Sequence, residues 1–261
     1  MNQKKNPNTV AVIEKALTVI TFLERTKEGV GLTEIARQTN INKTTCYRIL
    51  QTLMLDNIVE YGSVEGTYRL GFRLLELGNI VKRRIDVREI ALPYLKELTN
   101  NTDDTTYLCI LNNDASLCVE RIEGIYVQVL LLNIGDVWPL YVGAAPRAML
   151  AFLDDKKIDE ILATPDEKNI TVHSEIKHND YWSLIKDIRK KGYSVSYEDV
   201  IKGVSSIGAP IFDHKGRITA SVSISTTSQK LPPSKETKIA EQVLHTANQI
   251  SKSLGWQGDK K

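Results

Sequence analysis

The polar side chains best suited to chemistry in this 261-residue sequence gather within residues 43–51. Cations, hydroxyls and an amide occur there without a carboxylate: Lys43, Thr44, Thr45, Tyr47, Arg48 and Gln51. Cations neutralise phosphates, and hydroxyl or amide groups hydrogen-bond to phosphates or to base edges. Thr44, Thr45 and Tyr47 are candidates for base edges or phosphates. The group as a whole is suited to a polyanion, with Lys43 and Arg48 as candidates for its phosphates.

Two short helices within residues 32–55 must position these side chains. Apolar residues recur at helical spacing on both sides of a polar break at 38–40. They give each helix one buried face: Leu32, Ile35 and Ala36 in the first, and Ile41, Cys46, Ile49, Leu50 and Leu53 in the second. Asn40 tolerates the left-handed conformation that the turn requires. The stretch predicts a helix-turn-helix whose second helix enters a DNA major groove, with an ordinary solvated helical hairpin as the alternative.

A helix and a hairpin are predicted on either side of this motif. Apolar residues at spacings of three and four predict an amphipathic helix from 12 to about 25. After the motif, residues 56–61 leave the helix for a strand, and a glycine-rich turn leads to a second strand over 67–70. This order is a winged helix, whose hairpin tip reaches the DNA backbone or minor groove, and Arg69 is its best cation. The alternative is that the hairpin only covers the core.

Charge is distributed unevenly along the chain. Residues 1–90 contain 14 Lys and Arg against 10 Asp and Glu, a balance of +4, and the remaining residues carry −2. This excess is small, but its sign agrees with phosphate contacts near the predicted helix-turn-helix. We therefore expect a flexible N-terminal arm over 1–9 and a winged helix-turn-helix DNA-binding domain over 10–70.

A linker helix is expected over 71–90. Apolar residues recur at helical spacing from Phe72 to Ile85, and basic residues lie on the polar side of this helix. This stripe can pack on a second domain, on a partner subunit or on both. DNA-binding winged helices commonly pair so that two recognition helices reach successive major grooves about 34 Å apart. We expect a homodimer, with a dimer of dimers as the larger alternative.

The second half predicts an α+β domain over 91–255, followed by a C-terminal tail over 256–261. Its strands are expected over 105–111, 116–122, 127–133, 139–141, 192–197, 204–212 and 218–225. Its helices are expected over 91–100, 156–163 and 179–190, and in a segment that ends at Phe152 and has Pro146 in its first position. A last amphipathic helix is expected to be capped by Ser234. Helices at both ends of an antiparallel sheet are typical of a sensor-like domain.

Small residues and hydroxyls predict a ligand pocket in this domain. The candidates are Trp138, Tyr141, Gly143, Ala144, Ala145, Ser205 and Ser206. The glycine and the two alanines precede a helix N-terminus, where free N–H groups and the helix dipole favour an anion. The two serines interrupt an apolar strand, so one hydroxyl should face inward, and the two aromatic rings can form a wall. The alternatives are a tight connection at 143–145 and serines that satisfy local backbone groups.

Patterns for catalysis or metal binding are not evident. The four histidines show neither metal-ligand nor triad spacing: His173, His178, His214 and His245. The three cysteines lie in apolar patterns and predict reduced, buried thiols and a cytoplasmic location: Cys46, Cys109 and Cys118. We expect no metal and no cofactor. The sequence has no apolar run long enough to span a membrane, and its polar start predicts no signal peptide.

Several local motifs, in this order and spacing, resemble the IclR family of bacterial transcription regulators over nearly the whole chain. They are Leu32–Ala36, Lys43–Leu50, Tyr68–Gly71, Lys191–Tyr193, Gly203–Asp213 and Ser221–Ser225. The resemblance implies a GAF-like C-terminal domain that binds a small metabolite, often a carboxylate. That metabolite would tune DNA binding by the N-terminal winged helix.

Two departures from the family pattern fall in the expected pocket. Pro146 and Arg147 stand where the family usually has Gly followed by Lys or Arg. Ser196 and Ser206 stand where many members have an acidic residue and a Cys or Ser. From the family resemblance we expect a metabolite-tuned transcriptional regulator, more often a repressor, whose effector is an organic acid. The alternatives are a small-molecule enzyme and a ligand-independent interaction protein that uses the same α+β domain.

Overall fold

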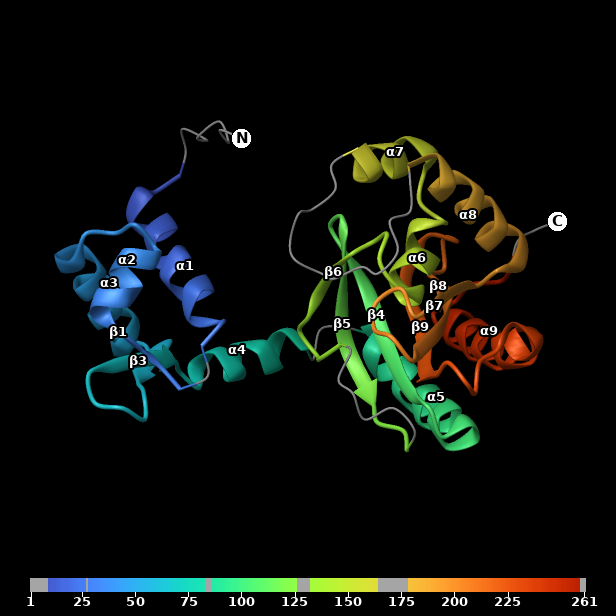
Figure 1. Ribbon diagram of the computed structural model, residues 1–261, viewed down its shortest axis with the longest axis horizontal. Coiled ribbons are helices and arrows are strands. Elements are labelled where there is room, and N and C mark those ends of the chain that lie inside the picture. The colour runs from blue at the N-terminus through green and yellow to red at the C-terminus, as the bar shows by residue number, and fades with distance from the viewer. Residues whose placement is uncertain (1–8, 27, 83–85, 126–131, 164–177, 259–261) are drawn as a thin grey trace. The chain divides into compact units, whose positions relative to one another are not determined.

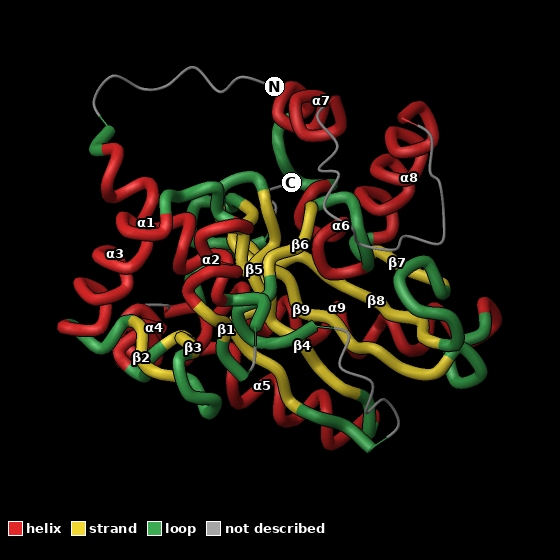
Figure 2. Tube along the Cα trace, turned by 60° about the vertical axis from the view of Figure 1, so that its left-hand side comes forward, coloured by secondary structure: helices red, strands yellow, loops and turns green. Residues whose placement is uncertain are grey.

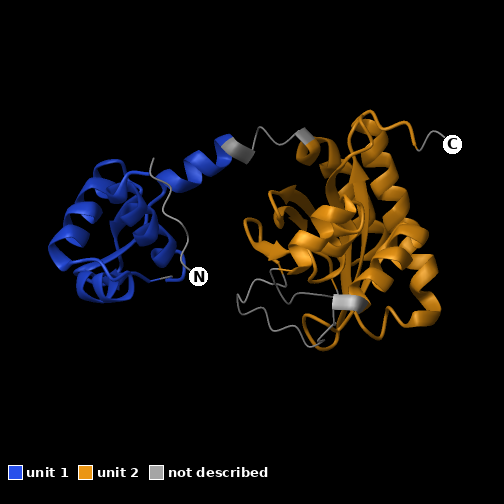
Figure 3. Cartoon of the chain, turned by 90° about the horizontal axis from the view of Figure 1, so that it is seen from above, with its two compact units in different colours: residues 1–84 blue, residues 85–261 orange. Residues whose placement is uncertain are grey.

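The chain divides into two compact units, residues 1–84 and 85–261 (Figure 3). The computed structural model describes residues 9–26, 28–82, 86–125, 132–163 and 178–258. The expected arm over 1–9 and strand over 127–133 fall almost entirely outside the described residues. His173 and the end of the expected tail fall outside them too.

Unit 1 is a winged helix-turn-helix with a further helix after it. Its elements are α1 (Ala11–Leu23), β1 (Val30–Gly31), α2 (Leu32–Gln38), α3 (Lys43–Leu55), β2 (Val59–Tyr61), β3 (Thr67–Leu70) and α4 (Arg73–Lys82). Val19, Leu23 and Ile35 pack with Cys46 and Leu50 in one buried core. The wing is a three-stranded antiparallel sheet in the order β1-β3-β2. The sequence predicted only the β2–β3 hairpin, because the two residues of β1 are too few to show alternation.

Two asparagines shape the turn between α2 and α3. Asn40 has a φ of 54°, the left-handed conformation that the sequence predicted, and the Ile41 N–H donates to the Ala36 carbonyl at 3.1 Å. Asn42 precedes α3, and its side-chain oxygen accepts a hydrogen bond from the Thr44 N–H at 3.0 Å. This N-cap satisfies one of the free donors at the start of α3. The first turn of the helix is thereby fixed.

Unit 2 is built on a six-stranded antiparallel sheet in the order β6-β5-β4-β9-β8-β7. Its strands are β4 (Thr105–Asn112), β5 (Ala115–Ile122), β6 (Val137–Pro139), β7 (Ser194–Tyr197), β8 (Val204–Phe212) and β9 (Ile218–Thr227). Its helices are α5 (Asp86–Thr102), α6 (Ala144–Leu150), α7 (Asp155–Ala163), α8 (His178–Lys191) and α9 (Glu236–Ser253), with a short 3-10 turn at Pro233–Lys235 before α9. The family-typical α+β architecture is thus present.

Helices cover both faces of this sheet (Figure 1, Figure 2). On one face, α5 and α9 pack against apolar residues that alternate along the central strands, among them Ile207, Val222 and Ile224. On the other face, α6 lies against β8 and β9, and Met149 and Leu150 join a second core with α7 and α8. Side chains alternate across a strand, so β9 presents apolar residues on one face of the sheet and hydroxyl-bearing residues on the other.

Three helix boundaries differ from the sequence-based expectations. The helix expected over 71–90 is two helices, α4 and α5, because Val87 is buried in the core of unit 2 whereas Leu75 and Ile80 on α4 are exposed. Helix α6 begins at Ala144, so Pro146 is its third residue, still in the turn whose N–H groups make no helical bonds. Ser234 does not cap the last helix, because Pro233 begins a 3-10 turn that contains it.

Candidate nucleic-acid interface and ligand cavity

The structure places six of the seven residues expected to bind DNA on α3 and the seventh, Arg69, on β3. Cys46, Ile49 and Leu50 face the core and are buried. The opposite side carries the polar group: Lys43, Thr44, Tyr47 and Arg48 are exposed, and Thr45 and Gln51 are half-buried. Thr45 and Arg48 also line a groove between α1 and α3, beside apolar residues of α1. Helix α3 therefore presents a continuous polar side to solvent.

The two cations of α3 make no ion pair with any described residue, which leaves them available for phosphate. The neighbouring helix α2 differs, because Arg37 pairs there with Glu34 at 2.6 Å. Hydrogen bonds from Arg37 and Gln38, together with the charge of Arg37, lower the pKa of Glu34 to about 2. The Glu34 carboxylate is thus occupied by residues of its own helix.

Arg69, the cation expected to act at the wing, is already paired. It lies opposite Glu60 in the β2–β3 register, and its Nη2 is 2.8 Å from the Glu60 Oε1. Its Nε donates to the same oxygen at 2.9 Å. Both side chains are about one-third exposed. A phosphate at the wing would have to compete with Glu60 for Arg69.

A cavity in unit 2 gathers most of the residues expected to bind a ligand. The empty space between its lining atoms, including the open mouth, is about 450 Å³. Six expected residues line it: Trp138, Gly143, Ala144, Ala145, Ser196 and Ser206. Tyr141 and Ser205 do not. The Tyr141 carbonyl accepts a hydrogen bond from Arg147, and the Ser205 hydroxyl lies 3.0 Å from that of Ser228.

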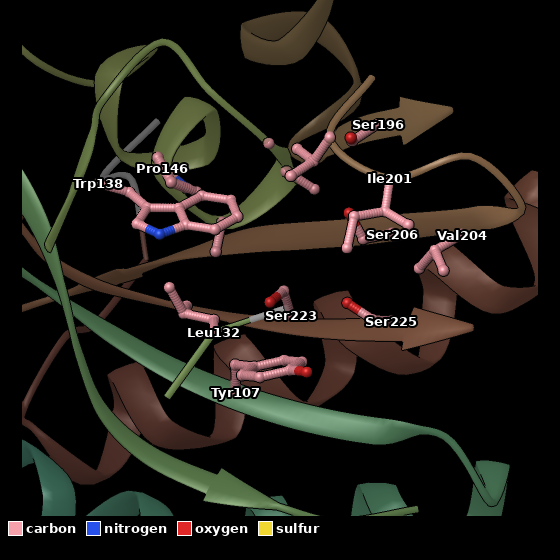
Figure 4. Close-up of a pocket in the computed structure, with 14 residues that line it drawn as sticks. Tyr107, Leu132, Trp138, Pro146, Ser196, Ile201, Val204, Ser206, Ser223 and Ser225 are labelled. Carbon is pink, nitrogen blue, oxygen red and sulfur yellow. The ribbon is translucent and has the colours of Figure 1, made fainter. Parts of the chain in front are cut away.

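Eight further residues line the cavity, and of these the sequence indicated only Pro146 as part of the expected pocket. They are Tyr107, Leu132, Pro146, Val200, Ile201, Val204, Ser223 and Ser225. Figure 4 shows Ser206, Ser223 and Ser225 grouped centrally, with Trp138 and Ile201 on opposite sides of them. One signal for the two serines of β9 was available: hydroxyl and apolar residues alternate from Ser221 to Ser225, which places the serines on one face.

Sheet register explains why the serines meet. Ser196 on β7 is opposite Ser206 on β8, and Ser206 is opposite Ser225 on β9. The next row contains Gly208 opposite Ser223, and Ser223 opposite Tyr107 on β4. A Cβ added at Gly208 would lie 2.8 Å from the backbone of Ala144. Glycine therefore lets the first turn of α6 touch the sheet, and the row beside it forms the cavity floor.

An ion pair lies next to the cavity. Arg147 on α6 is 4% exposed, and its Nη1 is 2.5 Å from the Oδ2 of Asp199, which is 6% exposed. The Arg147 Nε also donates to the Tyr141 carbonyl at 2.9 Å. Asp199 directly precedes two lining residues, Val200 and Ile201. The pair therefore ties the segment after β7 to α6 and positions one wall of the cavity.

Tyr107 brings the phenol of β4 to the cavity. It is 2% exposed, and burial raises the pKa of its hydroxyl to about 12, although the charge of Arg121 acts in the opposite direction. The phenol therefore stays protonated at physiological pH and can donate or accept a hydrogen bond. The described lining contains hydroxyls, backbone and apolar groups, and no charged side chain.

The described residues contain no group of three or more metal-ligating side chains, and no described helix is long and apolar enough to cross a membrane. All three cysteines are free and buried. Cys109 and Cys118 face each other across β4 and β5 within the core of unit 2.

Comparisons with known proteins agree with both units. Residues 12–63 match the IclR helix-turn-helix domain, and residues 80–252 match the family described as bacterial transcriptional regulator IclR C-terminal. The chain is 30% identical over 252 residues to the HTH-type transcriptional regulator KipR of Bacillus subtilis (strain 168), covering 97% of this chain and 99% of KipR.

Solved structures show the same likeness. An IclR transcriptional regulator from Alicyclobacillus acidocaldarius is 28% identical with a TM-score of 0.79, covering 95% of this chain and all of that one. The IclR of Thermotoga maritima is 27% identical with a TM-score of 0.76, covering 94% of this chain and 99% of that one. The chain therefore belongs to the IclR family of helix-turn-helix transcriptional regulators.

Proposed function

We propose that this regulator binds a double-stranded DNA operator through α3 and that a small metabolite in the unit 2 cavity tunes this binding. The observation that carries the proposal is the exposed side of α3, where Lys43 and Arg48 lie free of carboxylates among hydroxyls and an aromatic ring. Such a surface supplies both phosphate contacts and groups that can read base edges. The regulator acts where DNA is, in the cytoplasm.

The DNA-binding residues are Lys43, Thr44, Thr45, Tyr47, Arg48 and Gln51 on α3, with Arg69 at the wing. Of the cations, Lys43 and Arg48 contribute most, since no described residue forms an ion pair with them. Arg69 contributes less, because Glu60 holds it at 2.8 Å. Phosphate contacts position α3, and the hydroxyl and amide groups supply sequence preference.

The working form is a homodimer, with a dimer of dimers as the larger assembly. Unit 1 leaves four apolar side chains on and beside α4 at least 39% exposed: Phe72, Leu75, Leu77 and Ile80. Exposed apolar side chains clustered on one short segment are typical of a contact surface. Pairing of two chains would present two copies of α3 to successive major grooves.

The effector is a small organic acid, and the regulator acts as a repressor. Serine hydroxyls of the cavity floor can donate hydrogen bonds to a carboxylate without a cation beside it. A repressor role agrees with AllR of Escherichia coli (strain K12), a relative 24% identical that is described as an HTH-type transcriptional repressor.

We also propose domain limits of 10–70 for the DNA-binding domain, 71–90 for the linker and 91–255 for the ligand-binding domain.

Operator binding across a salt series tests the DNA-binding function. The probe is the DNA upstream of the regulator's own gene, titrated with full-length protein at several salt concentrations. We expect Arg48→Ala to weaken binding by about 1–3 kcal/mol if Arg48 contacts a base, or to lower the salt slope by about one if it contacts phosphate. Arg217→Ala, an exposed arginine of unit 2, is the matched control and should change neither quantity. Wild-type binding by Arg48→Ala would refute the assignment.

A further inference from the structure

Four serine hydroxyls of the cavity have no hydrogen-bond partner among the residues that the structure describes. Ser196, Ser223 and Ser225 are 3%, 4% and 5% exposed, and Ser206 lies between them in the sheet. None of the four makes a hydrogen bond with any described residue, although all four line the cavity. The oxygens of these four hydroxyls open onto the cavity, where a group that enters can hydrogen-bond to them. The cavity is therefore built to be completed by hydrogen-bonding groups that enter it.

The arrangement of these hydroxyls follows from the sheet. Ser196, Ser206 and Ser225 occupy three adjacent strands in register, so neighbours in this row are separated by roughly the 4.8 Å spacing of strands. Ser223 lies two residues from Ser225 along β9, so it extends the floor along the strand, at right angles to the row. The four hydroxyls thus form a two-dimensional set rather than a single contact. One terminal polar group on a ligand cannot reach all of them.

The chemistry of the lining narrows the class of ligand further. Each serine hydroxyl both donates and accepts, and the Tyr107 phenol stays neutral, so the best partner is a group that also donates and accepts, namely another hydroxyl. The described lining has no charged side chain that could pair with an ionic group of the ligand. Apolar side chains bound the floor on two sides, with Trp138 at one and Ile201 and Val204 at the other (Figure 4). These apolar side chains can pack against the C–H groups of a ligand's carbon skeleton.

We propose that the cavity binds a polyhydroxylated ligand, a carbon chain or ring with hydroxyls on several neighbouring carbons. This inference deepens the proposed function and rests on it, because it names the class of metabolite held in the same cavity. Ser196, Ser206, Ser223 and Ser225 exchange hydrogen bonds with the ligand hydroxyls, and Trp138 covers its C–H face. The shared chemistry occurs in neutral sugar alcohols and in sugar acids, and the test separates these two sources.

Four probes of similar size test the proposal with full-length protein. They are glucitol, a neutral polyol; gluconate, its acid counterpart; hexanoate, an acid of the same chain length without hydroxyls; and benzoate. Thermal unfolding detects binding, and isothermal titration calorimetry measures the dissociation constant. We expect glucitol or gluconate to raise the melting temperature and hexanoate and benzoate to leave it unchanged. Binding of glucitol as well as gluconate shows that the cavity requires no carboxylate, which would overturn the organic-acid effector but not the polyhydroxylated class; binding of gluconate alone identifies a sugar acid.

Serine variants then locate the binding. Ser206→Ala and Ser225→Ala should each weaken binding of the responding probe about tenfold, the effect expected when one hydrogen bond to a buried ligand is lost. Ser221→Ala is the matched control, because Ser221 is also buried without a hydrogen-bond partner on the same face of β9 and lies outside the cavity lining. It should leave the dissociation constant unchanged. Unchanged melting temperatures of the unliganded variants show that each is folded.

The outcomes distinguish this inference from the proposed function. Binding of hexanoate or benzoate without either hydroxylated probe refutes the polyhydroxylated class and leaves an acid effector standing. Equal affinities of Ser206→Ala and Ser221→Ala for a hydroxylated probe refute the serine floor as its site. No response to any of the four probes also refutes the proposed class. Operator binding, measured on the same preparations, reports separately whether the DNA-binding function holds.

Discussion

The two polar regions of this regulator are built in opposite ways. The α3 surface is exposed, carries unpaired cations and comes from one continuous helix. The cavity floor is buried and uncharged, and comes from β4, β7, β8 and β9. The ion pair next to it, Arg147 and Asp199, is neutral as a whole, with its charged atoms 2.5 Å apart. This difference matches the two ligands proposed, a polyanion for α3 and a hydroxylated molecule for the cavity.

Substitutions on the α3 surface should affect DNA binding alone, whereas substitutions at the buried ion pair of unit 2 should affect stability. An exposed side chain can be removed from α3 without leaving a buried group unsatisfied, and such changes are usually within about 0.5 kcal/mol in stability. The Arg147–Asp199 pair beside the cavity is buried, so removing one partner leaves the other desolvated and unpaired. The two regions should therefore separate in experiments that measure operator affinity and unfolding together.

The largest expected effect is on the stability of unit 2. Arg147→Met leaves Asp199 buried without its counter-ion, and breaking such a pair costs about 3–5 kcal/mol. Urea unfolding followed by tryptophan fluorescence measures it, because all three tryptophans lie in unit 2: Trp138, Trp182 and Trp256.

Two further variants complete this test. Replacing both members of the pair, as in Arg147→Met with Asp199→Leu, should recover most of the loss, since no charge is then left unpaired. Arg217→Met removes an exposed arginine paired with Asp213 and should cost less than about 1 kcal/mol. A loss below about 1 kcal/mol for Arg147→Met would show that the pair is not a buried ionic contact.

The same contrast explains what the sequence could predict. The helix-turn-helix and the α3 surface were predictable because their residues are consecutive and their 3.6-residue period is local, and the β2–β3 hairpin was predictable from its turn residues. Even the left-handed turn residue, Asn40, followed from residue type. The cavity was predictable only in part, since its floor depends on which strands are neighbours and on their register. Tyr107, in a strand more than 80 residues before Ser196, gave no local sign of the shared site.

Ion pairing also could not be read from the sequence. Arg69 was chosen as the wing cation because it stands in a short strand after a glycine-rich turn. The β2–β3 register places it opposite Glu60, which the sequence analysis did not consider. Likewise, the sequence offers no sign that Arg147 pairs with Asp199, which lies 52 residues later. Contacts between distant residues decide such roles.

A smaller effect is expected at the wing. Arg69→Ala should weaken operator binding by up to about 1 kcal/mol, less than Arg48→Ala, because a phosphate gains little from a guanidinium already held by Glu60. Glu60→Gln should release Arg69 and strengthen binding, and Glu60→Gln with Arg69→Ala should abolish that gain. Fluorescence anisotropy with labelled operator measures all three variants. A larger loss for Arg69→Ala than for Arg48→Ala would reverse the ranking of α3 over the wing.

The smallest effect concerns the pH dependence of stability in unit 1. Hydrogen bonds from Arg37, and then from Gln38, lower the pKa of Glu34 from its ordinary value near 4.5 to about 2. A carboxyl whose pKa is lowered by folding stabilises the native state above its unfolded pKa. This contribution is fully present above pH 4.5 and is lost as pH falls through about 2. Because the pair is exposed, the change should be slight and should shrink at high salt.

Circular dichroism of full-length protein at pH 5 and pH 3 measures this change through the thermal unfolding of the helices. Glu34→Gln should remove this part of the difference in melting temperature between the two pH values, and Arg37→Gln should remove less of it, because Gln38 still donates to Glu34 in that variant. Operator binding at pH 7 by Glu34→Gln should stay close to wild type, because Glu34 is held by α2 and does not neutralise the cations of α3. A marked rise in operator affinity would instead show that Glu34 opposes phosphate binding at the α3 surface.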